Sequence, residues 1–394
     1  MKRMNIILSF LLSFFLVFTS YGRIENKVAI NNGSNILYVG GMGPDNYTNI
    51  QDAINDANDG DTVFVYSGTY YEHVRIYKSI NLIGENKETT IIDGRNETNV
   101  TVFSIEANYV NFSHFTIRNA PGGEWIDALS VIGDYIRISD SIIRNCDGLS
   151  FHSTKNILVE NCSISHNLWG ISISGENSIK VKNCTISYNF AKKDENGWYV
   201  GGYGIIIFGA NYPIINISIT DCSIHHNGVG IMAFFVSNIH ISNCDLYNHN
   251  RTAISMGLSS NCTISTCNIS HSNTGIGMGS STNVTIEKCN IENNSWGIKV
   301  EYNNQKISIL YNNIKKNTAY GIDIWGRVKR ISINYNNICK NKVGLKAKAT
   351  FCDARYNYWC SKLGPSSLFG LRGDKIKTIF AKVFYFPWLV REYE

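Results

Sequence analysis

The chain has 394 residues, a net charge of +5 and 44% hydrophobic residues. Its Lys and Arg residues are scattered without a basic stripe, which argues against nucleic acid as a partner. The chain is long for one globular core, but a solenoid grows by adding turns and needs only one domain.

The first segment has the features of a secretory signal. A basic start at Lys2 and Arg3 precedes an apolar run from Ile6 to Phe18, and small residues follow up to Gly22. We expect residues 1–22 to be a signal peptide, so that the mature protein has no transmembrane span. The protein would then be secreted, either to the cell envelope or to the extracellular space, and an uncleaved anchor is the alternative.

Residues 23–106 are predicted to hold a cap and the first, irregular turns. A strand is expected at Ile36–Val39. Thr48, with Gln51 three residues later, has the form of a capping box that opens a short helix. This helix would cover the open first turn of a solenoid, as terminal repeats must be capped. Strand-like runs follow at Thr62–Tyr66, Val74–Tyr77, Ser79–Ile83 and Thr90–Ile92.

Residues 107–350 contain a repeat of about 22 residues. One column of this repeat comprises Cys162, Cys184, Cys222, Cys244, Cys267, Cys289, Asn312 and Asn336. A fixed period of this size predicts a solenoid. A column position between two apolar positions points inward, so these cysteines are expected to be buried thiols. Disulfides are an alternative, with Cys262–Cys267 or pairs among Cys339, Cys352 and Cys360 as candidates.

Each period has three short runs in which apolar and polar residues alternate. In one period the runs are Ile157–Val159, Cys162–Ile164 and Ile171–Ile173. Such runs predict strands with one buried face. Three strands in about 22 residues cannot pair within the period, so successive periods must stack about 4.8 Å apart. The sequence therefore predicts an all-β, single-stranded, three-sided parallel β-helix.

Two segments resemble a known superfamily. Ile50–Gly94 resembles the opening segment of right-handed parallel β-helix proteins, which include pectin-lyase-like proteins and NosD-type periplasmic or envelope proteins. Ala354–Ser367 and Gly373–Leu389, within a closing segment at residues 351–394, look like the end of such proteins, although Cys360 stands where they have Gly. The resemblance implies a right-handed β-helix, and it is specific for the fold rather than for an activity.

Two insertions, Ala120–Asp127 and Phe190–Tyr203, leave the same corner of the repeat three turns apart. Insertions in a solenoid collect on one face, which is often the binding face. We predict a groove with Asp147 and Trp169 as its floor. Its walls would be Glu124, Trp125 and Asp127 on one side and Lys192, Asp194, Glu195, Trp198 and Tyr199 on the other. Aromatic faces beside charged groups suit a sugar chain, so we expect polysaccharide binding, with solvated loops as the alternative.

Whether the protein is an enzyme stays open at this point. A glycoside hydrolase needs two carboxyl groups, for which Asp147 with Asp127 or Asp194 are the candidates. A lyase would use a Lys or Arg base, often with Ca²⁺. Trp125-Ile126-Asp127 resembles a pectate-lyase signature, but Ala128 stands where that signature has His. A pectin methylesterase is disfavoured, because Ile205 replaces the Asp of its motif.

A metal site is the third alternative and follows from the NosD resemblance. His226 and His271 share one column, and histidines on neighbouring turns can bind copper. Asn248 interrupts this column, so these two residues are weak candidates. A purely structural surface protein is the remaining alternative. The chain also has 13 Asn-x-Ser/Thr triplets, which are glycan acceptors if the host glycosylates. We expect a monomer.

Overall fold

The computed structural model describes residues 34–121, 127–175, 178–193, 199–209, 214–366 and 373–393. The chain divides into two units, Met1–Ser34 and Asn35–Glu394. The predicted signal peptide, residues 1–22, belongs to the first unit and lies outside the described residues. All helices and strands described below belong to the second unit.

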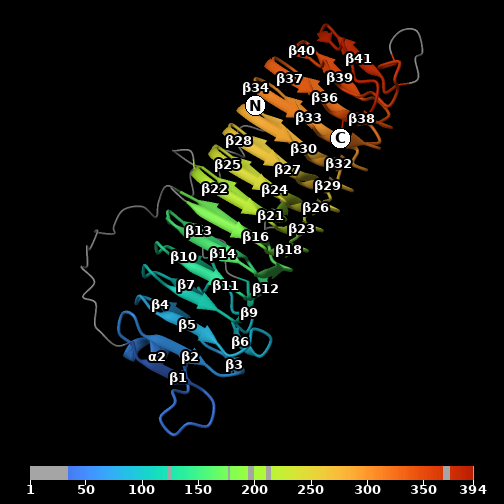
Figure 1. The fold of residues 1–394 in the computed structure, drawn as a ribbon. Coiled ribbons are helices and arrows are strands. Elements are labelled where there is room, and N and C mark those ends of the chain that lie inside the picture. The colour runs from blue at the N-terminus through green and yellow to red at the C-terminus, as the bar shows by residue number, and fades with distance from the viewer. Residues whose placement is uncertain are drawn as a thin grey trace. The chain divides into compact units, whose positions relative to one another are not determined.

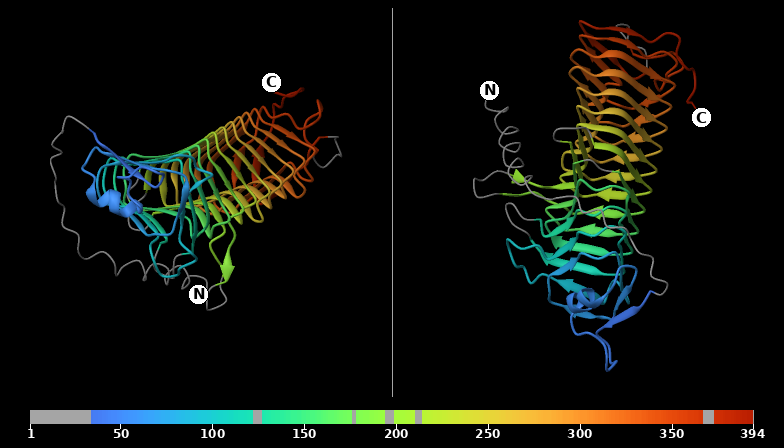
Figure 2. Two further views of the ribbon diagram at one scale, coloured as in Figure 1. Left: turned by 90° about the horizontal axis from the view of Figure 1, so that it is seen from below. Right: turned by 90° about the vertical axis from the view of Figure 1, so that its left-hand side faces the viewer.

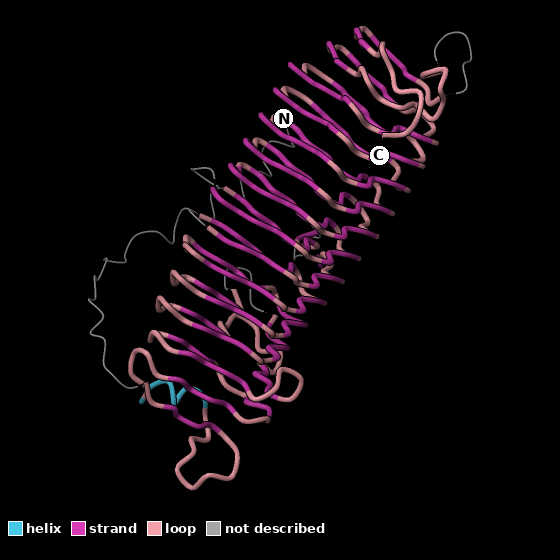
Figure 3. Tube along the Cα trace, in the orientation of Figure 1, coloured by secondary structure: helices cyan, strands magenta, loops and turns pink. Residues whose placement is uncertain are grey.

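Asn35–Glu394 is a parallel β-solenoid made of three long sheets (Figures 1 and 3). Each regular turn gives one strand to each sheet, so strands that lie side by side are about one period apart in the sequence, and among the described turns only those at the two ends give fewer. Strand neighbours in the three sheets pair in parallel, as the repeat requires. The predicted all-β, three-sided parallel β-helix is confirmed.

The strands of each sheet follow one another along the solenoid. The 15-stranded sheet comprises β1 (Ile36–Val39), β2 (Thr62–Val65), β5 (Asn81–Gly84), β8 (Asn111–Ser113), β11 (Arg137–Ser139), β14 (Ile157–Glu160), β17 (Ile179–Lys182), β22 (Ile214–Thr220), β25 (Val236–Ser242), β28 (Ser260–Ser265), β31 (Thr282–Glu287), β34 (Gln305–Leu310), β37 (Lys329–Asn334), β40 (Phe351–Asp353) and β42 (Lys382–Phe384). The 13-stranded sheet comprises β4 (Val74–Ile76), β7 (Phe103–Ile105), β10 (Leu129–Val131), β13 (Leu149–His152), β16 (Trp169–Ser174), β21 (Tyr203–Phe208), β24 (Val229–Phe234), β27 (Thr252–Gly257), β30 (Thr274–Gly279), β33 (Trp296–Glu301), β36 (Tyr320–Trp325), β39 (Leu345–Lys348) and β41 (Ile376–Ile379). The 12-stranded sheet comprises β3 (Gly68–Tyr70), β6 (Thr90–Asp93), β9 (Thr116–Ala120), β12 (Ile142–Cys146), β15 (Ser163–Ser165), β18 (Thr185–Ser187), β23 (Ser223–His225), β26 (Asp245–Tyr247), β29 (Asn268–Ser270), β32 (Asn290–Glu292), β35 (Asn313–Lys315) and β38 (Asn337–Cys339).

The predicted capping helix is present as α2 (Ile50–Asp56), at the end where the solenoid begins (Figure 1). It buries Ile50 and Ala53 in the core. The prediction of Thr48 as its N-cap is wrong, because the cap position is Asn49, whose side chain makes no capping bond. The carboxylate of Glu72, from the next turn, accepts hydrogen bonds from the first two helical N–H groups at 2.8 and 2.9 Å. Glu72, which is distant in sequence, thus caps the helix in place of the predicted capping box.

Isoleucine and valine columns form the core along the whole solenoid. Ile164 pairs in register with Ile186, and Ile171 with Ile205, and all four side chains are fully buried. Because side chains alternate along a strand, the residues between them point away from the core. This alternation decides which residues the 13-stranded sheet presents on its outer face.

All 11 cysteines are free, and all but Cys360 are buried. None of the candidate disulfides, including Cys262–Cys267, is formed. Burial raises the pKa of the Cys146 thiol to about 12, and that of Cys262 to about 11. These two thiols therefore stay protonated. The column cysteines from Cys162 to Cys289 are likewise buried in the apolar core, as the column predicted.

The corner asparagines form buried ladders. The Asn317 amide oxygen accepts the backbone N–H of Asn294 at 3.0 Å, and its Nδ2 donates to the carbonyl oxygen of Ile291 at 3.2 Å and to Asn341 Oδ1 at 2.9 Å. Asp374 ends this ladder by accepting from the backbone N–H and side chain of Asn341 at 3.0 and 2.8 Å. The ladder gives hydrogen-bond partners to backbone N–H and C=O groups at the corners.

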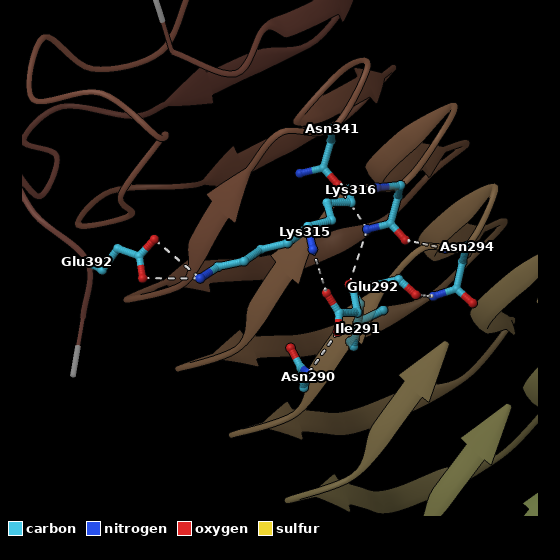
Figure 4. Close-up of polar contacts among 9 residues, drawn as sticks. Asn290, Ile291, Glu292, Asn294, Lys315, Lys316, Asn341 and Glu392 are labelled. Carbon is cyan, nitrogen blue, oxygen red and sulfur yellow. Dashed lines mark hydrogen bonds and ion pairs between the residues drawn. The ribbon is translucent and has the colours of Figure 1, made fainter. Parts of the chain in front are cut away.

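The C-terminal residues return to the 12-stranded sheet. Lys315 donates to both carboxylate oxygens of Glu392, at 3.2 and 3.1 Å (Figure 4). Asn337 exchanges two hydrogen bonds with the backbone of Tyr393. Earlier in this closing segment Cys360, which stands where the resemblance expects Gly, has φ +63°. The backbone there adopts the left-handed conformation that favours Gly.

Candidate functional site

The outer face of the 13-stranded sheet carries a row of acidic and aromatic residues where successive strands begin. Strands β10, β13 and β16 pair in register. Asp127, Asp147 and Trp169 hold the equivalent position on these three turns, and Trp169 pairs with Tyr203 on the next. The backbone N–H of Trp169 donates to the carbonyl oxygen of Asp147 at 2.8 Å. Neighbouring strands are about 4.8 Å apart, so these side chains lie next to one another.

Asp127 is the centre of a hydrogen-bonded group on this face. Its Oδ2 lies 2.6 Å from His152 Nε2, and its Oδ1 accepts from the Ser150 hydroxyl at 3.1 Å. His152 Nδ1 lies 2.9 Å from Ser174 Oγ. In a neutral His152 ring, Nε2–H donates to Asp127, which leaves Nδ1 to accept from Ser174. The His152 and Asp127 side chains remain 27% and 30% exposed, so a ligand can reach the pair.

The Asp147 carboxyl group has a pKa raised well above the usual range of an aspartate. Asp147 is only 6% exposed. Burial is the main cause that raises its pKa to about 7, and the negative charge of Asp127 adds to this effect while Lys192 opposes it. A carboxyl group that titrates near the working pH is suited to general acid and base catalysis. Asp147 is therefore the strongest candidate for proton transfer in the described part of the chain.

Trp169, which was predicted as part of the groove floor, lies on a strand. It is the first residue of strand β16, because its backbone pairs with Tyr203. Its Nε1 is buried and has no hydrogen-bond partner among the described residues. Gly148, with φ +135°, allows this close packing, since a Cβ there would lie 2.1 Å from the Trp169 carbonyl oxygen. The ring is thus fixed beside Asp147 and offers part of its surface to solvent.

The second insertion contains two short antiparallel strands that project from the solenoid (Figure 2). Strand β19 (Lys192–Lys193) pairs with β20 (Tyr199–Val200). Both lysines are exposed, and the charge of Lys192 acts on Asp147. The remaining predicted wall residues, Glu124, Trp125, Asp194, Glu195 and Trp198, lie outside the described residues, and only the backbone of Tyr199 is described. Asp127, which was predicted as a wall, lies in the same row as Asp147.

Sequence reasoning missed His152, Ser150 and Ser174. Their positions follow from the alternation in β13, where every second residue faces outward, and from the register that aligns His152 with Ser174. A shallow hollow of about 310 Å³ adjoins this group and extends the face toward the N-terminal turns. The residues that line it are His73, Val74, Arg75, Thr101, Ser104, Glu106, Ser130 and Ile132. The candidate site is therefore an elongated surface rather than a single pocket.

The predicted metal candidates do not converge. His226 Nε2 contacts the side chain of Asn248 at 3.2 Å, and His226 Nδ1 lies 2.9 Å from His225 Nδ1. His271 lies on the turn beyond Asn248. Within the described ranges, no three His, Cys, Asp or Glu side chains are grouped so that they could hold a metal ion. In the same ranges, no helix has the length and apolar character needed to cross a membrane.

Comparisons with known proteins agree with the fold. Residues 203–352 match the family model described as the right handed beta helix region. No curated protein sequence matches the chain.

Solved structures extend the likeness over most of the chain. The Azotobacter vinelandii mannuronan C-5 epimerase AlgE6 A-module is 14% identical, with a TM-score of 0.62 over 86% of this chain and 96% of that chain. The periplasmic alginate epimerase AlgG is 13% identical, with a TM-score of 0.52 over 86% of this chain and 84% of that chain. The Agl-KA catalytic domain is 14% identical, with a TM-score of 0.57 over 92% of this chain and 70% of that chain. At such identities the likeness shows the fold.

Proposed function

We propose that this protein, whose fold is that of the pectin-lyase-like right-handed parallel β-helices, binds a polysaccharide along the outer face of its 13-stranded sheet and transfers protons to and from the bound sugar. The binding surface would run from the hollow at Arg75, past Asp127 and Asp147, to Trp169. The observation that carries the proposal is the buried Asp147 carboxyl group, which titrates near pH 7 beside the His152–Asp127 pair.

The shape and chemistry of the face support a sugar chain as the ligand. Arg75 and Glu106 form a two-bond ion pair at 2.7 and 2.6 Å in the hollow, and Ser104 and Ser130 line its floor in register. Such fixed polar groups can take sugar hydroxyls, while an aromatic ring such as Trp169 packs on the apolar face of a sugar ring. This surface is built on strands, which hold it rigidly.

Polysaccharides that contain uronic acids are the substrate class we propose. The similar solved structures include enzymes whose names give mannuronan and alginate as substrates. A C-5 epimerase removes the proton at C5, next to the sugar carboxylate, and returns a proton to the opposite side; a lyase removes the same proton and expels the glycosidic oxygen. Asp147 and the His152–Asp127 pair offer two groups that can exchange protons, and Lys192 offers a cation for the sugar carboxylate. Hydrolysis by the Asp127 and Asp147 carboxyl groups is the alternative on the same residues.

A panel of uronate-containing and neutral polysaccharides tests this proposal. We expect wild type to bind at least one member of the panel, Trp169→Ala to bind it more weakly, and Asp147→Asn to bind it without turning it over. The matched control is Asp45→Asn, an exposed carboxylate far along the chain from the site. Binding that is absent in wild type, or that is the same in Trp169→Ala, would reject the proposed face. New reducing ends without unsaturated sugars would identify hydrolysis instead.

The hydrogen-bonded series Asp127–His152–Ser174 favours a second candidate, removal of O-acyl groups from a polysaccharide. In that reaction Ser174 Oγ would attack the acyl carbonyl while its proton passes to His152 Nδ1. The ester bond to the sugar would then break, and the sugar hydroxyl would leave with the proton from His152. Water, losing a proton to His152, would finally attack the acyl-serine, which releases the acid and restores the Ser174 hydroxyl. Release of acetate from an acetylated polysaccharide, lost in Ser174→Ala, would support it. Equal release by that variant would reject it.

We further propose that the protein is exported and acts as a monomer in the envelope or outside the cell. The support for export is the sequence of residues 1–22. N-terminal sequencing of the mature protein from fractionated cells tests it, and an intact Lys2 in a cytoplasmic fraction would contradict it. Light scattering of the purified protein tests the monomer.

A further inference from the structure

A second group of charged and aromatic residues lies on the outer face of the same sheet, on strands β33, β36 and β39. Lys299, Asp323 and Lys346 pair in register across these three strands. Toward the start of the strands, Trp296 pairs in register with Tyr320. Toward their ends, Glu301 pairs with Trp325, and Trp325 pairs with Lys348. We call this set the lysine–aromatic face. Its centre, Asp323 on β36, lies seven turns from Asp147, which corresponds to about 34 Å along the solenoid.

Asp323 at its centre is a buried carboxylate with one unused oxygen. The residue is 4% exposed, although its side chain points outward between the core residues Ile322 and Ile324. Lys346 Nζ contacts Oδ2 at 3.2 Å, but Oδ1 is buried and has no hydrogen-bond partner among the described residues. A buried acceptor without a donor is unfavourable, and such groups in native proteins are often used for binding. Oδ1 is thus available to a hydroxyl group of a ligand.

Three ammonium groups of this face lie over aromatic rings. Lys346 Nζ is 4.6 Å from the centre of the Tyr320 ring, and Lys348 Nζ is 5.4 Å from that of Trp325. Lys299 Nζ is 5.7 Å from the Trp296 ring and 2.8 Å from the Glu301 carboxylate. Cation–π contacts at partly exposed positions are weak, so an ammonium group can turn from its ring to a stronger anionic partner. Leaving the ring also uncovers an aromatic surface.

Positive charge exceeds negative charge here. Lys299 and Lys346 have carboxylate partners in Glu301 and Asp323. Lys348 has no ion-pair partner within the described ranges, and Lys377 extends the central row by pairing in register with Lys346. Two ammonium groups are therefore left for an anionic ligand. Flat aromatic rings, an acceptor for a hydroxyl and spare ammonium groups together match a sugar that carries a carboxylate or sulfate.

We propose that the lysine–aromatic face is a separate binding site for acidic oligosaccharides. Successive sugar rings would pack on Tyr320 and on Trp325, at the two ends of β36, a hydroxyl would donate to Asp323 Oδ1 between them, and the acidic group would bind Lys348 and Lys377. The site uses no residue of the Asp147 group. Its existence therefore does not depend on the function proposed for that group.

The test is a titration of the full-length protein carrying Asp147→Asn and Trp169→Ala, which blocks turnover and weakens binding at the Asp147 group, with oligouronates, sulfated oligosaccharides and neutral oligosaccharides of equal length. This parent protein should still bind one of the acidic series, and adding Lys348→Gln and Lys377→Gln should weaken that binding about tenfold or more. The charge-matched control instead adds Lys180→Gln and Lys182→Gln, two exposed lysines on the 15-stranded sheet, and should bind like the parent. Each variant is first checked for an unchanged melting temperature.

Fluorescence provides a second measurement at the face itself. Binding should change the tryptophan emission of the parent protein, and Trp325→Phe should remove most of that change. The inference is overturned if the parent binds no acidic oligosaccharide, if neutral oligosaccharides bind equally well, or if the variant lacking Lys348 and Lys377 binds like the charge-matched control.

Discussion

Asp147→Asn should stabilise the protein above neutral pH, although it removes the group that we assign to proton transfer. A carboxyl group whose pKa rises from 3.8 to about 7 on folding binds its proton more tightly in the folded state. Stability is therefore lost as pH increases from about 4 to 7, and above 7 the folded state bears the full cost of the buried charge. The difference in pKa corresponds to about 4 kcal/mol. An amide at this position would carry no charge at any of these pH values.

The expected gain in the free energy of unfolding is smaller than this value of about 4 kcal/mol, because the amide N–H groups of the new Asn side chain would be buried without an acceptor, at a cost of about 1–3 kcal/mol. We therefore expect Asn at this position to raise the free energy of unfolding by between about 1 and 4 kcal/mol at pH 8, and to give no gain at pH 4. Chemical denaturation of wild type and variant at both pH values, with Asp45→Asn as control, measures the difference. Equal stability at pH 8, or an equal gain at both pH values, would refute the assignment of a raised pKa to Asp147.

Three further predictions concern the scaffold. Asn317→Ala leaves buried backbone groups of Asn294 and its neighbours without partners, so we expect the free energy of unfolding, measured by denaturant titration, to fall by about 2–4 kcal/mol. The control Asn268→Ala, at an exposed position, should lower it by less than about 1 kcal/mol. Gly148→Ala puts a Cβ 2.1 Å from the Trp169 carbonyl oxygen, so Trp169 must move. We therefore expect both the near-ultraviolet circular dichroism and polysaccharide binding to change. A variant that equals wild type in both measurements would show that the close packing is not required. A thiol reagent should label 11 cysteines in denaturant without reductant, but in the native protein only Cys360 should react rapidly; fewer than 11 would reveal disulfides.

The fold could be predicted because the same pattern of buried and exposed positions recurs in every period of the sequence. The Ile164 and Cys162 columns fix which side chains are buried, and the length of one period leaves stacking as the only way to pair its strands. The capping helix was predicted in the right place, but its N-cap residue was not, because the cap position is Asn49 rather than Thr48. Glu72, which satisfies the first N–H groups of the helix, lies a turn away, so no local pattern reveals it.

The site could be predicted only in part. The interruptions of the repeat pointed to the sheet face that carries Asp147 and Trp169. His152 and Ser174 occupy ordinary outward positions of the repeat, where polar residues are common, and only the register brings them to Asp127. The raised pKa of Asp147 also depends on burial that the sequence does not show. Candidate functional residues such as His152 and Ser174 thus lie on the strands of the repeat as well as in the inserted loops.

The central claim is that Asp147 exchanges protons with a polysaccharide bound on the outer face of the 13-stranded sheet. The most direct test is nuclear magnetic resonance of uronate-containing polysaccharides incubated with the protein in D₂O, which detects deuterium at C5 and any unsaturated product. We expect wild type to introduce deuterium at C5 or to generate the unsaturated sugar, and Asp147→Asn to do neither while still binding the chain. Equal exchange or elimination by wild type and Asp147→Asn would contradict the claim, as would a wild type that binds the chain and changes nothing in it.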